Sequence, residues 1–298
     1  MNHTLGFIGL GIMGGPMARN LSIKFPRIRV YDADSKKIDS LVSSSEGRIL
    51  PASSIQEVGS ICDRVFLSLP TSEVVKTVTL GNGGLIEGMK SGGIVIDVST
   101  TETSVVLEIA STLKKNGIAF LDAPVSGGEK AALEGTLSFM VGGDEEVFQT
   151  CKPYLEAMGA SVVRTGTTSM GQVAKCINQM IVGATFAAIA ESFALGVRAG
   201  LDPKVLYEAI KGGWAGSKLL DVAATDMFSR EFKPGGTVDI HWKDLGYALS
   251  LSKNQDTPTP VTALVHEIFK AARASGDGKK SQPAVVRLWE RLLGIEVK

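Results

Sequence analysis

Cysteine, histidine and tryptophan are scarce in this 298-residue sequence, which contains three of each. Cys62, Cys151 and Cys176 are odd in number and far apart, which excludes a disulfide framework and fits a reducing compartment. The three histidines stand in no metal-ligand spacing with a cysteine or with one another. We therefore expect no metal site.

An excess of charge of either sign is also missing, since 31 lysines and arginines balance 31 aspartates and glutamates. The balance excludes the basic footprint of a nucleic-acid-binding protein. The longest apolar stretch, about residues 173–197, is interrupted by Lys175, Asn178, Gln179 and Glu191, so we expect no membrane span. The first apolar run leaves no room for a signal or transit peptide, and we expect a soluble cytoplasmic protein.

What the sequence does contain is a glycine turn near its start. The apolar run 5–8 leads into Gly9-x-Gly11-x-x-Gly14, and a helix-like stretch follows over 16–21. In a chain with 34 glycines the spacing alone is a weak signal, but a strand before it and a helix after it are the context of a dinucleotide-binding turn. The residues expected to contact the cofactor here are Gly9, Leu10, Gly11, Ile12, Met13 and Gly14.

An acidic residue completes this fingerprint. The second predicted strand covers 28–31, and Asp32 follows it directly, 18 residues after Gly14. A carboxylate there accepts hydrogen bonds from the adenosine ribose and repels a 2′-phosphate, which favours NAD. Lys36 and Lys37 are close enough in sequence to keep NADP possible. The alternative interpretation of Asp32 is an ordinary helix N-cap.

The two parts of the chain have different periodicities. Up to about residue 166, short β-branched runs at 64–69, 94–97, 118–121, 137–141 and 161–164 alternate with helix-like stretches, two of them at 103–115 and 145–158. This alternation predicts an α/β Rossmann-type domain, 1–165, with a mostly parallel sheet covered by helices on both faces. No convincing strand follows, so residues 166–298 are predicted to form an all-α domain. Its helices are expected at about 171–199, after Asp202-Pro203, and at 218–229, 243–253, 261–274 and 283–293.

A serine followed by two glycines stands after one of the predicted strands. Ser126, Gly127 and Gly128 belong to the segment 122–128, which follows the strand 118–121. A hydroxyl and exposed backbone N–H groups form a good cradle for a small carboxylate. A simple glycine turn is the alternative.

A lysine with an amide neighbour stands in the long apolar helix. Lys175, Asn178 and Gln179 are three and four residues apart and share one helix face. Partial burial among apolar neighbours disfavours the ammonium form and moves a lysine pKa toward the working pH of an acid/base catalyst. The alternative is a lysine that extends from a helix edge to solvent. Lys243 either reaches the cofactor or substrate or begins a solvated helix.

Taken together, these segments resemble the β-hydroxyacid dehydrogenase family, which includes 3-hydroxyisobutyrate, tartronate-semialdehyde and threonate dehydrogenases. The resemblance covers essentially the whole chain. It is carried by segments 6–14, 122–128, 135–137 with 141–143, Lys175 with Asn178, and Lys243 with Asp244.

The resemblance implies a Rossmann domain, a long connecting helix, and a helical domain for substrate binding and dimerisation, 166–298. It also implies a homodimer or homotetramer. It implies Lys175 as the catalytic acid/base and Asn178 as its orienting partner. Substrate contacts would come from Ser126, Gly127 and Gly128, and further cofactor contacts from Leu69, Pro70, Thr100 and Lys243. The substrate would be a small hydroxycarboxylic acid.

The sequence departs from the family pattern at two positions. Gln179 replaces the second of two asparagines, which leaves open whether Asn178 or Gln179 is the main partner of Lys175. Gln179 is also expected to contact the substrate. Ala131 replaces a common glycine and narrows the expected pocket. Trp214 either lines the substrate pocket or packs between helices. The expected reaction is oxidation of a short β-hydroxy acid with NAD. An NADPH-dependent reductase of a small aldehyde acid and a non-catalytic dinucleotide sensor are the alternatives.

Overall fold

The computed structural model describes residues 3–298, and the chain divides into two compact units, residues 1–175 and 176–298. The division falls inside the long helix α9 (Met170–Arg198). The predicted boundary at residue 165 lies ten residues earlier. The first turn of α9 belongs to the first unit, because Gln172 in this turn is hydrogen-bonded to Thr101 and Asp122 of that unit.

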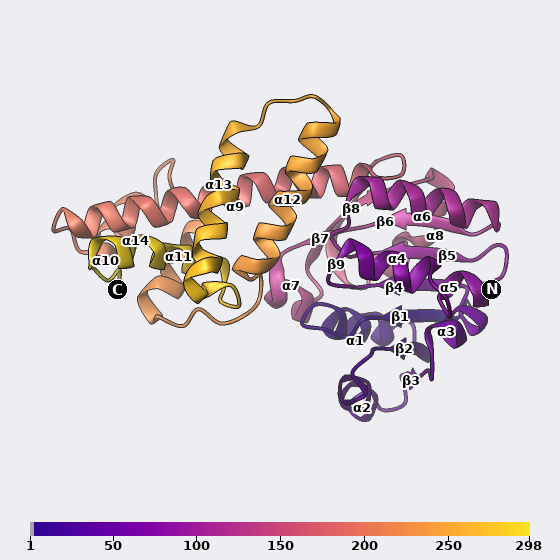
Figure 1. Ribbon diagram of the computed structural model, residues 1–298. Coiled ribbons are helices and arrows are strands. Elements are labelled where there is room, and N and C mark those ends of the chain that lie inside the picture. The colour runs from indigo at the N-terminus through magenta and orange to yellow at the C-terminus, as the bar shows by residue number, and fades with distance from the viewer. Residues whose placement is uncertain (1–2) are drawn as a thin grey trace. The chain divides into compact units, whose positions relative to one another are not determined.

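The first unit is built on one mixed sheet (Figure 1). Its strands run in the order β3-β2-β1-β4-β5-β6-β8-β7, with β9 paired to β8. The first six are parallel; β8 is antiparallel to β6 and β7, and β9 is parallel to β8. The strand bounds are β1 Leu5–Ile8, β2 Ile28–Tyr31, β3 Ile49–Pro51, β4 Arg64–Leu67, β5 Ile94–Asp97, β6 Ala119–Asp122, β7 Val125–Ser126, β8 Leu137–Gly142 and β9 Gly159–Gly166.

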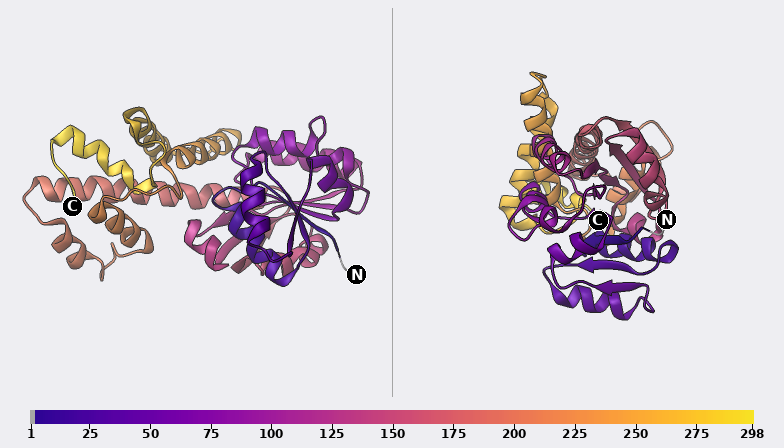
Figure 2. Two further views of the ribbon diagram at one scale, coloured as in Figure 1. Left: turned by 90° about the horizontal axis from the view of Figure 1, so that it is seen from below. Right: turned by 90° about the vertical axis from the view of Figure 1, so that its right-hand side faces the viewer.

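Helices cover both faces of this sheet (Figure 2). They are α1 Gly14–Lys24, α2 Ser35–Ser43, α3 Ile55–Ile61, α4 Ser72–Leu80, α5 Leu85–Gly88, α6 Thr103–Lys115, α7 Gly128–Glu134 and α8 Glu145–Leu155. The strand order reverses between β1 and β4, and a ligand of such a sheet binds at the carboxyl ends of the strands beside that point.

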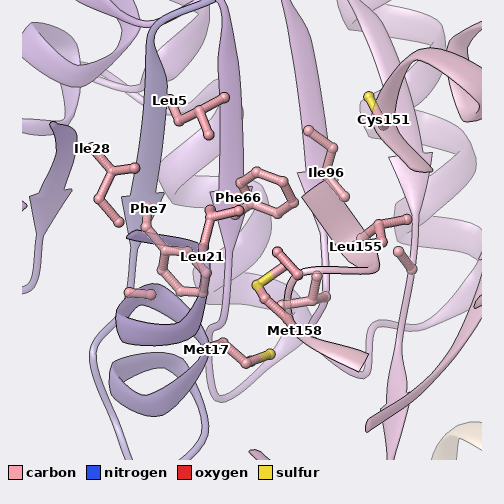
Figure 3. Close-up of a cluster of buried hydrophobic side chains, with 14 of the residues drawn as sticks. Leu5, Phe7, Met17, Leu21, Ile28, Phe66, Ile96, Cys151, Leu155 and Met158 are labelled. Atoms are coloured by element: carbon pink, nitrogen blue, oxygen red, sulfur yellow. The ribbon is translucent and has the colours of Figure 1, made fainter. Parts of the chain in front are cut away.

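Each strand contributes side chains to two cores because successive residues face opposite sides of the sheet. Phe7 and Phe66 lie in the core beneath α1 and α8, where their rings stack with centroids 5.9 Å apart (Figure 3). Val65 and Leu67, which precede and follow Phe66 on β4, lie in the core beneath α3, α4 and α6. Burial on both faces explains why the parallel strands are almost continuously apolar in sequence.

The second unit is helical. Besides the remainder of α9 it contains α10 Pro203–Ile210, α11 Lys218–Ser229, α12 Val238–Asn254, α13 Pro260–Ala272, the π-type turn Arg273–Asp277, the 3-10 turn Gln282–Val285 and α14 Val286–Leu293. Phe186 and Phe193 of α9 pack with Leu245 of α12 and Phe269 of α13 in its core. The predicted fold class, a mostly parallel Rossmann-type domain followed by a long helix and an all-α region, is confirmed.

Helix α9 is long and apolar enough to cross a membrane by length and composition, since an 18-residue window within it has a mean hydropathy of 1.8, and 33% of that window is buried. The interrupting polar residues therefore do not exclude a span on that criterion. Phe186, Ala187, Ala190 and Phe193 of α9 lie in the buried core of the helical unit.

Several element boundaries differ from the sequence prediction. Helix α12 begins at Val238 and not at Lys243, because the Thr237 side chain accepts a hydrogen bond from Ile240 N and caps it. The segment predicted as one helix over 283–293 begins instead with a 3-10 turn. Strands β3 and β7, three and two residues long, were not predicted.

Candidate active site

The glycine turn follows β1 at the switch point of the sheet. Gly9 has φ +94°, a backbone conformation that favours glycine, and its N–H donates to Tyr31 O at the end of β2 (2.9 Å). A Cβ on Gly14 would lie 1.9 Å from Gly9 O, so this position accepts only glycine at the start of α1. The turn is therefore as tight as a dinucleotide-binding turn requires.

The same turn leaves room for a ligand. Nothing lies within 4 Å of a Cβ built on Gly11, which is exposed together with Ile12. No side chain of the described residues caps α1. Its first N–H groups and positive dipole end can therefore serve an anion. These features fit the pyrophosphate of a dinucleotide.

Asp32 holds the turn from the neighbouring strand. Its carboxylate accepts hydrogen bonds from Leu10 N (2.7 Å) and Asp34 N (2.8 Å), and Lys37 Nζ lies 3.5 Å away. Burial raises the pKa of Asp32, but these three partners outweigh it and hold the pKa below its ordinary value. The interpretation as a helix cap is wrong, because the Asp34 side chain caps α2. A carboxylate has acceptor sites left for ribose hydroxyls.

The two glycines give a first prediction. Gly14→Ala must move the Gly9 backbone, so we expect it to lower the free energy of unfolding by about 3 kcal/mol or more. Gly11→Ala meets no atom and should change that free energy by less than about 0.5 kcal/mol. It should nevertheless weaken dinucleotide binding because its methyl group occupies the open space. Urea unfolding and cofactor titration of both variants test this; equal unfolding midpoints would contradict the account.

The loops after β4 and β5 lie beside the turn and are tied together. Ser99 Oγ accepts a hydrogen bond from Leu69 N (2.8 Å), and Pro70 next to it is exposed. Thr100 is half-buried in the loop after β5. Leu69, Pro70 and Thr100 thus stand at the carboxyl ends of adjacent strands, and their role as cofactor contacts stays a prediction.

Ser126 lies on the short strand β7, where it pairs with Ser138 of β8, and not in a loop as expected. Gly127 and Gly128 follow with φ +132° and +70° and are exposed at the start of α7. Ala131 leaves no space for a side chain at Gly127, since a Cβ on Gly127 would lie 2.6 Å from Ala131 Cβ. The hydroxyl and the two glycines are half-buried to exposed, as a substrate cradle requires.

Lys175 is 7% exposed, so the interpretation as a lysine extending to solvent is wrong. The turn of α9 before it is fastened to the end of β6. Asp122, which is fully buried, accepts hydrogen bonds from Ser169 N (2.8 Å) and Gln172 N (2.9 Å). Ser126 stands four residues after Asp122. The strand end that leads to Ser126 therefore also fixes the helix that carries Lys175.

Burial raises the pKa of Asp122 to about 7, despite these backbone hydrogen bonds. Because this is above the value of about 3.8 in an unfolded chain, the folded state binds the proton more tightly between these values. The free energy of unfolding therefore falls as the pH rises through this window. From pH 5 to pH 8 we expect Asp122 to lower it by roughly 2 to 3 kcal/mol.

Urea unfolding of the wild type and of Asp122→Asn at both pH values measures this contribution. The variant changes the overall stability, but it should lack this part of the pH slope. Equal slopes would show that Asp122 does not titrate in this range.

In the helical unit, Gln179 is the centre of a buried polar cluster. Gln179 Oε1 accepts from Asn178 Nδ2 (2.9 Å), and its Nε2 donates to Asp244 Oδ2 (2.7 Å). The His241 ring lies 3.5 Å from Gln179 and 2.9 Å from Gln282, measured between Nδ1 and each amide nitrogen. Gln179 is thus engaged with side chains of its own unit, and its role as a substrate contact stays a prediction. The role of Asn178 as the orienting partner of Lys175 also stays a prediction.

Lys243 lies in the second turn of α12 and not at a solvated helix start. Its ammonium is 3.1 Å from Asp244 Oδ1 and 4.8 Å from the centre of the Tyr247 ring. Trp214 is fully exposed, so it does not pack between helices. The other roles predicted for Lys243 and Trp214 stay predictions.

Four buried polar residues of these networks, Asp122, Gln172, His241 and Asp244, were not singled out by sequence reasoning as site residues. Asp122 carried a signal, since an acidic residue at the end of a predicted strand is out of place unless it has partners. Within residues 3–298, no cluster of histidine, cysteine or acidic side chains could hold a metal ion.

Comparison with known proteins decides the family. Residues 4–167 match the NAD binding domain of 6-phosphogluconate dehydrogenase, and residues 169–289 match the NAD-binding family model of NADP-dependent 3-hydroxyisobutyrate dehydrogenase. The chain belongs to the β-hydroxyacid dehydrogenase family. This membership confirms the resemblance found in the sequence.

Individual relatives match over nearly the full length of this dehydrogenase. It is 36% identical to 2-(hydroxymethyl)glutarate dehydrogenase of Eubacterium barkeri, over 98% of this chain and 97% of the relative. It is 36% identical to 2-hydroxy-3-oxopropionate reductase of Escherichia coli, over 96% of this chain and 97% of that relative. The crystal structure of 3-hydroxyisobutyrate dehydrogenase from Salmonella typhimurium superposes with a TM-score of 0.87 at 30% identity. The superposition covers 96% of this chain and 99% of that structure's chain. The protein is an NAD(P)-dependent hydroxyacid dehydrogenase.

Proposed function

We propose that this dehydrogenase oxidises the hydroxyl group of a short β-hydroxy acid with NAD, and that Lys175 is the general acid/base. The observation that carries the proposal is the burial of Lys175 on a helix turn fastened to Asp122, at the strand end that leads to Ser126. A buried lysine at the carboxyl edge of a parallel sheet is placed for proton transfer and not for solubility.

Each residue then has a defined task. Ser126 and the N–H groups of Gly127 and Gly128 bind the substrate carboxylate. Lys175, in its neutral form, accepts the proton of the substrate hydroxyl, and Asn178, one helix turn further on, orients it. NAD, when bound, would supply the hydride acceptor for the carbinol carbon. The glycine turn would hold its pyrophosphate, and Asp32 would accept hydrogen bonds from its ribose hydroxyls.

Two observations support NAD over NADP. Asp32 is ionised, since its pKa lies below the ordinary value. Its negative charge would repel the 2′-phosphate that NADP carries on its ribose. Lys37, which could attract that charge, already pairs with Asp32 at 3.5 Å. The NADPH-dependent reduction of a small aldehyde acid, such as 2-hydroxy-3-oxopropionate, is the same chemistry in reverse and is the second candidate because of the Escherichia coli relative.

The test is a substrate panel in both directions. The purified protein is assayed at 340 nm with NAD and with NADP on 3-hydroxyisobutyrate, L-threonate, D-glycerate, L-serine and 2-(hydroxymethyl)glutarate, and with the corresponding aldehydes and NADH or NADPH. The proposal expects turnover of at least one β-hydroxy acid with a preference for NAD. Preference for NADPH with an aldehyde would favour the second candidate, and cofactor binding without any turnover would favour a dinucleotide sensor.

We also propose a cytoplasmic homodimer or homotetramer. Ile177, Ile181 and Leu195 of α9 are 51%, 62% and 68% exposed, and three large apolar side chains on one helix are a surface that a second copy would cover. Light scattering coupled to size exclusion should give twice or four times the chain mass of 31.4 kDa. A monomer would contradict this part of the proposal.

A further inference from the structure

Gln172 is a fully buried polar residue of the first unit that the proposed mechanism does not use. Its side-chain oxygen accepts a hydrogen bond from Thr101 N (3.0 Å), and its side-chain nitrogen donates to Ser99 O (2.8 Å). Its backbone N–H donates to Asp122 (2.9 Å). One residue on α9 therefore joins the loop after β5 to the end of β6.

The loop that Gln172 grips is itself fastened to its neighbours. Asp97, at the end of β5, accepts hydrogen bonds from Ser99 N (3.0 Å) and Thr101 Oγ1 (2.6 Å). The Ser99 hydroxyl accepts from Leu69 N (2.8 Å), which extends the connection to the loop after β4. The segment around Thr100 thus has one position relative to the strand ends.

The other end of the connection is equally well fixed. A Cβ on Gly171 would lie 2.5 Å from Asp122 O, and one on Gly142 would lie 2.6 Å from Asp122 Oδ1. Ser169, which donates to Asp122, has φ +77°, a conformation that a serine adopts only when its surroundings impose it. The first turn of α9 is therefore held against β6 by close backbone contact as well as by hydrogen bonds.

We propose that Gln172 is a positioning residue for the reaction, one that sets the place of Lys175 relative to the strand-end loops. The inference rests on the proposed role of Lys175. Gln172 and Lys175 are three residues apart, so they lie on the same side of α9, one turn apart. An amide suits this position because it donates and accepts at once, whereas a carboxylate would bring a third acidic side chain close to Asp97 and Asp122.

Two variants and a control separate positioning from mere stability. Gln172→Met keeps the length of the side chain and removes both of its hydrogen bonds. Gln172→Glu resembles glutamine only when it is protonated, since it then donates to Ser99 O and accepts from Thr101 N. The control is Gln149→Met on the exposed surface of α8. The kinetics are measured at a temperature at which circular dichroism shows each variant to be folded.

For Gln172→Met we expect kcat at saturating NAD and substrate to fall by roughly 10- to 100-fold, because small misplacements of reacting groups have effects of this size. The change in KM should be smaller, and Gln149→Met should match the wild type. The ratio of the Gln172→Glu rate to the wild-type rate should rise as the pH falls from 8 to 6. Wild-type kcat in folded Gln172→Met, or a ratio for Gln172→Glu that does not change with pH, would overturn the proposal.

A second readout keeps this proposal distinct from the proposed function. In hydrogen–deuterium exchange, Gln172→Met should raise the exchange of residues 99–101 and of residues 169–175 together. If the wild type oxidises none of the acids, the proposed function fails, and this joint change still tests the coupling. A rise confined to one of the two segments would overturn it.

Discussion

We expect Lys175→Met to lower kcat by roughly 100- to 10,000-fold, the range for loss of a placed acid/base. Methionine keeps the unbranched stem but cannot accept the substrate proton. Because Lys175 is 7% exposed, a methionine of similar length fills the same buried space, and the variant should remain folded. NAD affinity should also be retained, since the glycine turn and Asp32 are unchanged. Steady-state kinetics, urea unfolding and a cofactor titration measure the three quantities.

Two controls define what this loss means. Lys115→Met, on the exposed end of α6, should have wild-type activity. Lys175→Arg keeps a positive charge but does not deprotonate near neutral pH, so it should be as inactive as Lys175→Met if proton transfer is the task. Activity above about a tenth of wild type in Lys175→Met would show that Lys175 does not transfer the proton. An active Lys175→Arg would show that the positive charge of the side chain is needed and that proton transfer is not.

Asp32→Arg should reverse the proposed preference for NAD over NADP. The substitution removes the acceptor for the ribose hydroxyls and places a cation where a 2′-phosphate would lie. Hydrogen bonds to a charged group contribute about 1.5 to 3 kcal/mol each, so the ratio of kcat/KM for NAD to that for NADP should fall by at least about 100-fold. The substitution also removes the bond to Leu10 N, and some loss of stability is expected.

Asp32→Asn separates these two effects. Its amide oxygen still accepts from Leu10 N, so the glycine turn should keep its shape. The negative charge is lost, and discrimination against NADP should decrease without the reversal expected for Asp32→Arg. An unchanged NAD-to-NADP ratio in both variants would show that Asp32 supports the turn and takes no part in cofactor choice.

The parts of this structure that follow from local sequence were predictable. The glycine turn depends on the positive φ of Gly9 and on the absence of a Cβ at Gly14, so these two glycines identify it. The apolar strands and the helices α6 and α11 followed from their periodicity, and both helices have the predicted bounds. The burial of Lys175 was also foreseeable, because its helix neighbours are apolar.

Contacts between residues far apart in sequence were not predictable. Gln172 meets Ser99 and Thr101 across more than 70 residues, and no spacing rule connects them. His241 and Gln282 are 41 residues apart and meet only in the folded helical unit. Strand β3 contains three residues and ends in a proline, so its pairing with β2 and not its composition makes it a strand.

The most direct test of the central claim is the fate of the hydrogen on the carbinol carbon. Wild-type protein is given the β-hydroxy acid that it turns over, deuterated at that carbon, together with NAD, and the NADH formed is analysed by mass spectrometry and NMR. We expect each NADH to carry one deuterium on the nicotinamide ring and the lost hydroxyl proton to appear in solvent. NADH without deuterium would contradict direct hydride transfer from the hydroxy acid, and with it the role assigned to Lys175.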